Sequence, residues 1–307
     1  MRKFRKRIMG TALCFIILAV IIMLCYIFLK DDKIHISREN VKFYINTADE
    51  ASKGKLQINW QQLAVIDAVR YGRDFSKLDR NGTKELAKMF IESSKENKYR
   101  LLTLDEVLTK LDFNSNKKKK VYKYLNELEY VGLKRQNLNF YKSQMKFINE
   151  LKPEAIELYN KYGILPSITI SQAILESGWG KSELSVKANN LFGIKADKSW
   201  DGKSVSMKTG EFYNKTIVAK FRAYDSKSKS LKDYGEFLHV NKRYKRNGVF
   251  SASNYLEQAK AIERAGYSTK ENKNGDKIYA EAVINLIREN NLQLIDYDAQ
   301  IQKQNRE

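Results

Sequence analysis

Hydrophobic positions divide the chain into one long apolar run and a series of shorter amphipathic segments. The run, 8–29, holds 22 residues without a charge, which is enough to cross a bilayer as one helix. Residues 1–7 contain five basic residues and no acid, and basic residues before a span place the N-terminus in the cytoplasm. A cleaved signal peptide would have a shorter apolar core and a small-residue cleavage site. We therefore expect a cytoplasmic tail at 1–7 and a retained transmembrane anchor at 8–29, with the remainder outside the cell.

Residues 30–55 are polar and mixed, which predicts a stalk, and segments with helical periodicity follow. Helices are expected over 58–72, from Thr83 to Lys98, from the capping box Thr103-x-x-Glu106 to Leu111, and over 121–131 after a run of four lysines. Together these segments predict a small all-helical module over 56–136, without a catalytic signature and of unknown role. Asp67 lies on an otherwise apolar helix, so we interpret it as a structural hydrogen-bonding group.

The remaining segment, 137–307, is also mainly helical in pattern. Between 200 and 224 the period changes to two, with Val205 and Met207 alternating with polar residues, which predicts a β-ribbon. The fold class expected here is mainly α with one small β-ribbon. Helices are predicted over 141–151, 153–162, 167–176, 182–188, 227–238, 253–264 and 276–290.

Composition limits the kinds of site and partner expected for the outer portion of the chain, which follows the predicted anchor at 8–29. The net charge is +20, and a basic surface favours an anionic partner. Outside a cell, anionic wall polymers and the phospholipid surface are better candidates than nucleic acid. Both cysteines, Cys14 and Cys25, lie in the apolar run, so the outer portion can form no disulfide or thiolate metal site. The only histidines are His35 and His239, which excludes a histidine-rich metal centre, and we expect no metal and no cofactor.

One stretch, 164–180, carries the clearest chemistry. Pro166 suits the first turn of a helix, an apolar face follows, and Gly178 and Gly180 end the helix just after Glu176. A carboxylate at a helix C-terminus is disfavoured by the macrodipole, and burial beside apolar residues disfavours its charge further. A carboxyl that stays protonated near neutral pH is what a glycosidase needs to protonate a leaving oxygen.

This stretch belongs to a set of motifs that resembles one enzyme family. The motifs are QAILESGWGKS at 172–182, NNLFGIK at 189–195, FRAYD at 221–225, AGYS at 265–268 and IYA at 278–280. In this order they resemble the bacterial N-acetylglucosaminidases of glycoside hydrolase family 73, and the resemblance covers about 145–292. It implies a lysozyme-like α+β catalytic domain, preceded here by the helical module and the anchor.

The resemblance also implies roles for individual residues. Glu176 matches the general acid. Glu211, which follows Thr209 on the ribbon, matches the second carboxylate, with Asp197 and Asp201 as weaker rivals. A substrate with a 2-acetamido group could instead supply its own internal nucleophile. The other matching positions are a cleft-facing tyrosine, Tyr267, and the substrate-binding candidates Trp179, Asn189, Asn190, Phe192 and Tyr279, which packing or backbone turns would also explain.

Taken together, the sequence predicts a membrane-anchored hydrolase that cuts peptidoglycan strands after N-acetylglucosamine. A muramidase or a lytic transglycosylase on the same scaffold remains an alternative, as does a wall-binding protein without catalytic activity. Its partners would be glycan strands, anionic wall polymers and, through the anchor, the membrane.

Overall fold

The computed structural model describes residues 33–93, 98–129, 131–133, 138–211 and 215–306. Its contacts gather Ile36–Glu307 into one compact unit and Met1–His35 into another. No helix among the described residues combines the length and apolar character needed to span a bilayer, and the predicted anchor at 8–29 lies outside them. The predicted domain boundaries at 56 and 137 stay predictions.

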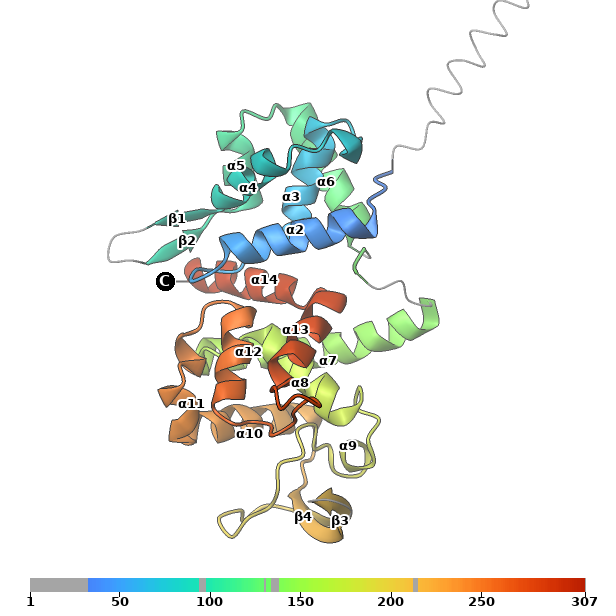
Figure 1. Cartoon of the computed structure of the whole chain (residues 1–307), viewed down its shortest axis with the longest axis vertical. Coiled ribbons are helices and arrows are strands. Elements are labelled where there is room, and N and C mark those ends of the chain that lie inside the picture. The colour runs from blue at the N-terminus through green and yellow to red at the C-terminus, as the bar shows by residue number, and fades with distance from the viewer. Residues whose placement is uncertain (1–32, 94–97, 130, 134–137, 212–214, 307) are drawn as a thin grey trace, which may run out of the picture. The chain divides into compact units, whose positions relative to one another are not determined.

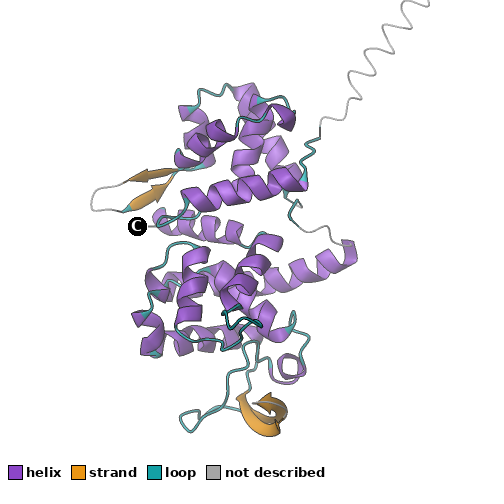
Figure 2. Cartoon of the chain, in the orientation of Figure 1, coloured by secondary structure: helices purple, strands orange, loops and turns teal. Residues whose placement is uncertain are grey.

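The fold is mainly helical with a small β component, as the sequence predicts (Figure 2). Two antiparallel hairpins contribute all the described strands: β1 (Ile91–Ser93) with β2 (Tyr99–Leu101), and β3 (Ser204–Glu211) with β4 (Lys215–Arg222). Figure 1 labels the helices, which are α2 (Arg38–Ala51), α3 (Trp60–Arg70), α4 (Arg80–Lys88), α5 (Leu104–Lys110), α6 (Ser115–Leu128), α7 (Leu138–Tyr162), α8 (Pro166–Ser177), α9 (Glu183–Ala188), α10 (Lys227–Val240), α11 (Lys242–Arg246), α12 (Tyr255–Arg264), α13 (Tyr279–Glu289) and α14 (Gln293–Gln304).

The predicted helical module contains the expected α3, α5 and α6. The capping box at Thr103 and Glu106 is present, because each side chain bonds the backbone N–H of the other residue. Asp67 is fully buried and accepts hydrogen bonds from Tyr44 Oη at 3.3 Å and Thr83 Oγ1 at 2.5 Å. The interpretation of Asp67 as a structural hydrogen-bonding group is therefore confirmed.

One helix of this module was predicted wrongly. The segment from Thr83 to Lys98 was expected to be a single helix capped by Thr83. Instead, Asp79 caps α4 through its bond to Asn81 N at 3.0 Å, and α4 ends at Lys88. Strand β1 begins three residues later and pairs with β2, so the module is not all-helical. Phe90 follows α4 and is fully buried. Its burial favours a chain that turns inward here over one that continues as a helix into solvent.

Helix α2 occupies most of the segment for which the sequence predicts a stalk. Its N-cap is Ser37, and its buried face includes Val41, Tyr44 and Ile45. Helices α2 and α3 pack together, and the ring of Tyr44 contacts that of Phe75 edge-on at 6.3 Å. Residues 38–51 are thus part of the folded unit.

The C-terminal half is built around α8, whose apolar face packs against α7, α12, α13 and α14. Helix α7 runs through Pro153 without a break, where the sequence predicts two helices separated at that proline. The β3–β4 ribbon has the predicted position, and Val205 pairs with Phe221 and Met207 with Ala219 in its register.

A buried ion pair joins α2 to the C-terminal half. Arg288 on α13 donates to Asp49 Oδ2 from Nη2 at 2.7 Å and from Nε at 3.1 Å. Tyr255 on α12 donates to the same oxygen at 2.6 Å. Asp49 is 5% exposed, so it depends on Arg288 for its counter-charge and on Tyr255 for a further hydrogen bond.

Asp49→Asn should lower the free energy of unfolding by about 2–3 kcal/mol, because it leaves the partly buried Arg288 without its counter-charge. Glu50→Gln is the matched control: Glu50 is exposed and its ion pair with Lys84 is 3.8 Å long, so the expected change is below about 0.5 kcal/mol. Urea denaturation of both variants measures the difference. Equal effects would show that the Asp49–Arg288 pair does not join the two halves.

Candidate active site

Helix α8 ends in a sharp turn directly after Glu176. Gly178, Trp179 and Gly180 follow with φ of 56°, 63° and 72°, all left-handed, which is uncommon for a residue as bulky as tryptophan. Ser177 holds the turn, because its Oγ accepts from Gly180 N at 2.7 Å and its carbonyl accepts from Ser182 N at 2.8 Å. Glu176 is therefore left at the open end of a buried helix.

The carboxyl of Glu176 lies against a buried tyrosine. Tyr279 Oη donates to Glu176 Oε1 at 3.0 Å. Glu176 as a whole is exposed, but its carboxyl is partly desolvated by the surrounding protein. This desolvation raises the pKa of Glu176 above its usual value, while the Tyr279 hydrogen bond and the charge of Lys270 lower it by less. The structure therefore makes Glu176 hold its proton more tightly than an ordinary glutamate, as the helix position predicts.

A chain of buried hydrogen bonds fixes the orientation of Tyr279. Tyr234 Oη donates to Gln172 Oε1, Gln172 Nε2 donates to Tyr279 Oη at 2.7 Å, and Tyr279 donates to Glu176. Tyr234 and Gln172 are fully buried, and Tyr279 is nearly so. All three bonds donate in the same direction, toward Glu176, and aligned bonds in a dry interior reinforce one another. This series of hydrogen bonds thus directs the phenolic proton of Tyr279 at the carboxyl of Glu176.

Two members of this chain were not among the predicted site residues. Gln172 precedes Glu176 by four positions, so the two share one face of α8. A glutamine at that spacing on an otherwise apolar helix is a signal that sequence reasoning could have used. Tyr234 lies on the buried face of α10, where an aromatic residue is ordinary and gives no such signal.

The two predicted tyrosines differ in what they contact. Tyr279, expected to stack on sugar or to pack, is the one that bonds Glu176. Tyr267 is half-buried and lies 5.3 Å from the Tyr279 ring and 6.5 Å from the Tyr244 ring. Burial raises the pKa of both Tyr267 and Tyr279, so both phenols stay neutral. Tyr267 therefore supports the Tyr279 ring, and its expected contact with substrate stays a prediction.

Trp179 packs on the domain as well as facing outward. Its ring contacts that of Phe147 edge-on at 6.0 Å, and the side chain is half-buried. Gly180 is needed beside it, since a Cβ at that position would come within 2.7 Å of the Phe147 ring. Stacking of a sugar on Trp179 stays a prediction.

Asn189, Asn190 and Phe192 have structural contacts. Asn190 is 1% exposed, and its amide bonds only backbone, including Ile194 O at 2.9 Å and Arg222 O at 2.8 Å. Asn189 adopts φ 51° at the end of α9 and donates to Tyr224 O at 2.9 Å. Phe192 stacks on Tyr234 at 4.0 Å. Asn190 and Phe192 are thus held by packing and backbone contacts, and their contact with substrate stays a prediction.

Glu211 lies at the tip of the β3–β4 ribbon. It is the last residue of β3 and pairs with Lys215, and its side chain is outside the described part of the structure. The base of the ribbon is at the pair Ser204–Arg222, seven residue steps away, which is about 23 Å along a strand. The predicted second carboxylate is therefore carried at the end of the ribbon farthest from its attachment.

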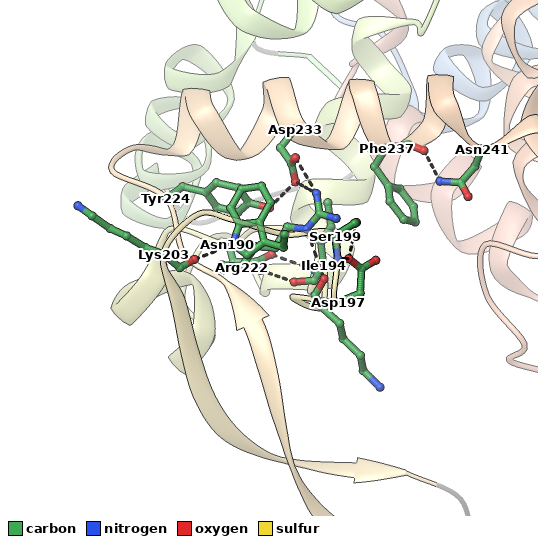
Figure 3. Close-up of polar contacts among 12 residues, drawn as sticks. Asn190, Ile194, Asp197, Ser199, Lys203, Arg222, Tyr224, Asp233, Phe237 and Asn241 are labelled. Atoms are coloured by element: carbon green, nitrogen blue, oxygen red, sulfur yellow. Dashed lines mark hydrogen bonds and ion pairs between the residues drawn. The ribbon is translucent and has the colours of Figure 1, made fainter.

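The ribbon base is fixed to α10, as Figure 3 shows. Arg222 Nη1 bonds both carboxylate oxygens of Asp233, at 2.8 and 3.0 Å, and Tyr224 Oη donates to Asp233 Oδ2 at 2.6 Å. The Arg222 guanidinium also lies 4.5 Å from the centre of the Trp200 ring. These contacts hold the start of the ribbon beside the residues that support Tyr234. The rival acid Asp197 is exposed, and Ser199 bonds and lowers the pKa of its carboxyl, so Asp197 is suited to stay ionised.

Comparison with known proteins agrees with this geometry. Residues 152–292 match the glucosaminidase family model, described as mannosyl-glycoprotein endo-beta-N-acetylglucosaminidase. Residues 152–292 thus form a glucosaminidase domain. The matched segment includes α8 with Glu176 and the whole hydrogen-bond chain from Tyr234 to Tyr279, and it is the domain of a glycoside hydrolase.

Similar proteins include bacterial enzymes that share this glucosaminidase segment. The exo-glucosaminidase LytG of Bacillus subtilis is 42% identical over 163 residues, which are 50% of this chain and 54% of that protein. The peptidoglycan hydrolase FlgJ of Vibrio parahaemolyticus is 37% identical over 46% of each chain. The chain thus spans about half the length of the curated relatives it matches. A solved peptidoglycan hydrolase from Sphingomonas sp. A1 is 31% identical, with 50% of this chain and 94% of that one covered and a TM-score of 0.41.

Tyr279→Phe should raise the pKa of Glu176, because it removes the one side-chain hydrogen bond that favours the ionised carboxylate. Tyr267→Phe is the matched control, since Tyr267 makes no hydrogen bond to Glu176 among the described residues, and it should leave that pKa unchanged. Carbon-detected NMR titration measures both, with the Glu176 signal assigned by its absence in Glu176→Gln. If only the Tyr267 variant shifted the pKa of Glu176, Tyr267 and not Tyr279 would be the tyrosine that bonds Glu176.

Proposed function

We propose that this chain is a peptidoglycan hydrolase that cleaves the β-1,4 bond after N-acetylglucosamine, with Glu176 as the general acid. The observation that carries the proposal is the carboxyl of Glu176: it stands at the exposed end of a buried helix, its pKa is raised by desolvation, and Tyr279 orients it. A protonated carboxyl held in this way can donate its proton to the oxygen of a glycosidic bond. The glucosaminidase family and the names of its wall-cutting relatives support peptidoglycan as the substrate.

For the second group in the reaction we propose Glu211. Its place on the ribbon, after Thr209, supports this role, and so does the need for a group that activates water or stabilises the cationic sugar. In a competing mechanism, the 2-acetamido group of the substrate supplies the nucleophile. In that mechanism Glu211 would orient the amide or a water molecule.

Glu176→Gln should reduce glycan hydrolysis by about 10²–10⁴-fold, because the amide keeps the shape of the side chain but has no acidic proton to donate. Glu183→Gln is the control: Glu183 lies seven positions further on, is exposed, and pairs only with Lys187 at 2.6 Å. Its activity should stay within about twofold of wild type. Release of reducing ends from purified peptidoglycan measures both variants, and a Glu176 variant as active as wild type would reject the proposal.

Mass spectrometry of the end-labelled products identifies the bond. Reducing N-acetylglucosamine supports the proposed specificity, reducing muramic acid would make the enzyme a muramidase, and an anhydro end would make it a lytic transglycosylase. Products of mixed length indicate cutting inside strands, as the family description says, whereas a single short product indicates cutting from strand ends, as the name of the Bacillus subtilis relative says.

Glu211→Gln separates the two mechanisms. A loss comparable to that of Glu176→Gln, rescued by azide and giving an inverted product, supports direct participation of the Glu211 carboxylate. A mild loss with retained anomeric configuration supports the acetamido group as nucleophile. Asp201→Asn tests the weaker rival on the same segment: Asp201 is exposed, and this variant should keep its activity if Glu211 is the second carboxylate.

We further propose that the enzyme is anchored by one helix over 8–29, with the glucosaminidase segment outside the cell. The uncharged run behind five basic residues supports this topology, and the net positive charge of the rest supports contact with anionic wall polymers. The full-length protein should remain in the membrane pellet after alkaline extraction, whereas a variant lacking 2–30 should be released. A mature secreted form that begins near residue 30 would replace the anchor with a signal peptide.

A further inference from the structure

Asp296 is a fully buried carboxylate outside the site described above. It lies on α14 and accepts two hydrogen bonds from one residue, Ser167: from the backbone N–H at 2.8 Å and from Oγ at 2.5 Å. No basic side chain pairs with it in the described part of the chain. A buried acid without a counter-charge is costly, so its retention calls for a physical reason.

The reason lies at the start of α8. The N-cap position of this helix is Leu165, which has no side-chain acceptor, and Pro166 follows. Other helices of the same half supply their own caps, such as Ser182 for α9 and Asn254 for α12. In α8 the free N–H of Ser167 is instead satisfied by Asp296 from a different helix. The oxygens of its carboxyl group take the place of the missing cap at the N-terminus of the helix.

Helix α8 is therefore held at both ends. Asp296 fixes its first turn, and the bonds from Gln172 and Tyr279 fix its last turn. Ser167 and Glu176 are nine residues apart, about 13 Å along the helix, with no glycine or proline between them. A displacement of the first turn is consequently transmitted to the carboxyl of Glu176, whose 3.0 Å bond to Tyr279 tolerates little movement.

The helix that carries Asp296 is itself attached to the N-terminal half of the unit. Gln300 accepts from Gln57 N at 2.8 Å and donates to Ser253 O at 2.7 Å. One turn later, Gln304 bonds both the N–H and the carbonyl of Leu101, at 2.9 and 3.0 Å. Helix α14 lies beyond the family match at 152–292.

We propose that Asp296 is a positioning residue for the general acid: it caps α8 from α14 and thereby sets the place of Glu176 against Tyr279. Its catalytic consequence rests on the proposed function, whereas its effect on the Glu176–Tyr279 bond does not. Burial raises the pKa of Asp296 to about 7, partly offset by the two bonds from Ser167, which are its only resolved partners. The carboxyl titrates near 4 in an unfolded chain, so between about pH 4 and pH 7 only the folded protein holds this proton. Stability from this group is therefore greatest at low pH and falls as the pH rises through this range.

The test compares Asp296→Asn with Asp298→Asn on the same helix, where Asp298 is exposed and makes no contact with α8 in the structure described here. Thermal melts of the full chain at pH 5 and pH 8 give the first measurement. Asp296→Asn cannot titrate, so its melting temperature should depend less on pH than that of wild type, and the wild-type advantage should shrink by several degrees from pH 5 to pH 8. Burial raises the pKa of Asp298 as well, but by less than that of Asp296, so Asp298→Asn should reduce the pH dependence less than Asp296→Asn does. An unchanged pH dependence in Asp296→Asn would overturn the assignment of a buried, titrating cap.

The second measurement is the state of Glu176. As α8 shifts and the Tyr279 bond weakens, the pKa of Glu176 should rise in Asp296→Asn, seen by carbon-detected NMR. With soluble glycan fragments, kcat should fall about tenfold while KM changes less than about twofold, and the basic limb of the pH profile should move to higher pH. Ser167→Ala, which keeps the N–H bond, should give an intermediate effect.

Two outcomes separate this inference from the proposed function. If Asp296→Asn melts at a lower temperature but keeps the wild-type kcat, basic limb and Glu176 pKa, Asp296 is structural only and the inference fails. If wild type cuts no glycan, the proposed function fails, while the NMR and melting measurements still decide whether Asp296 positions Glu176.

Discussion

The hydrogen bond from Tyr279 to Glu176 is the contact on which the rest of this site depends. It is strong only while the phenol points at the carboxyl, and that direction is imposed by Gln172, whose own orientation is imposed by Tyr234. Each of these groups is buried, so none can turn to water for a substitute partner. The apolar packing of α8 against its neighbours excludes water from these hydrogen bonds. The same exclusion of water raises the pKa of Glu176. The packing of α8 and the proton affinity of Glu176 are therefore set by the same buried arrangement of side chains.

Much of this could be predicted from the sequence, and the exceptions have physical causes. Periodicity located α3, α8, α10, α12 and the β3–β4 ribbon, and the helix end at Gly178 located Glu176. Helix α14 gave no apolar period, because its buried positions include Gln293, Asp296 and Gln300, whose partners are far away in sequence. The β1–β2 hairpin has strands of three residues, too short for an alternating pattern to register.

Within the site, residue type alone did not predict which contacts each side chain makes, because these contacts depend on the surrounding structure. Tyr267 and Tyr279 have the same side chain and lie in neighbouring motifs, so no local pattern could assign the hydrogen bond to one of them; the start of α13 at Tyr279 decides it. Asn190 belongs to a polar loop motif that suggests a groove, yet the carbonyls of Ile194 and Arg222 draw its amide inward. In both cases the contacts depend on the folded backbone, which residue type alone does not reveal.

The bond between Ser167 and Asp296 also bears on the order in which the structure forms. It joins residues 129 positions apart, and the bond between Gln57 and Gln300 closes a loop of 243. Contacts of such long range form late, because loop-closure entropy must be overcome before they contribute. A nascent chain that has completed 152–292 therefore still lacks the cap of its acid-bearing helix. Synthesis order alone delays the Ser167–Asp296 bond until α14 has emerged, so the first turn of α8 gains its cap only after nearly all of the described chain has been made.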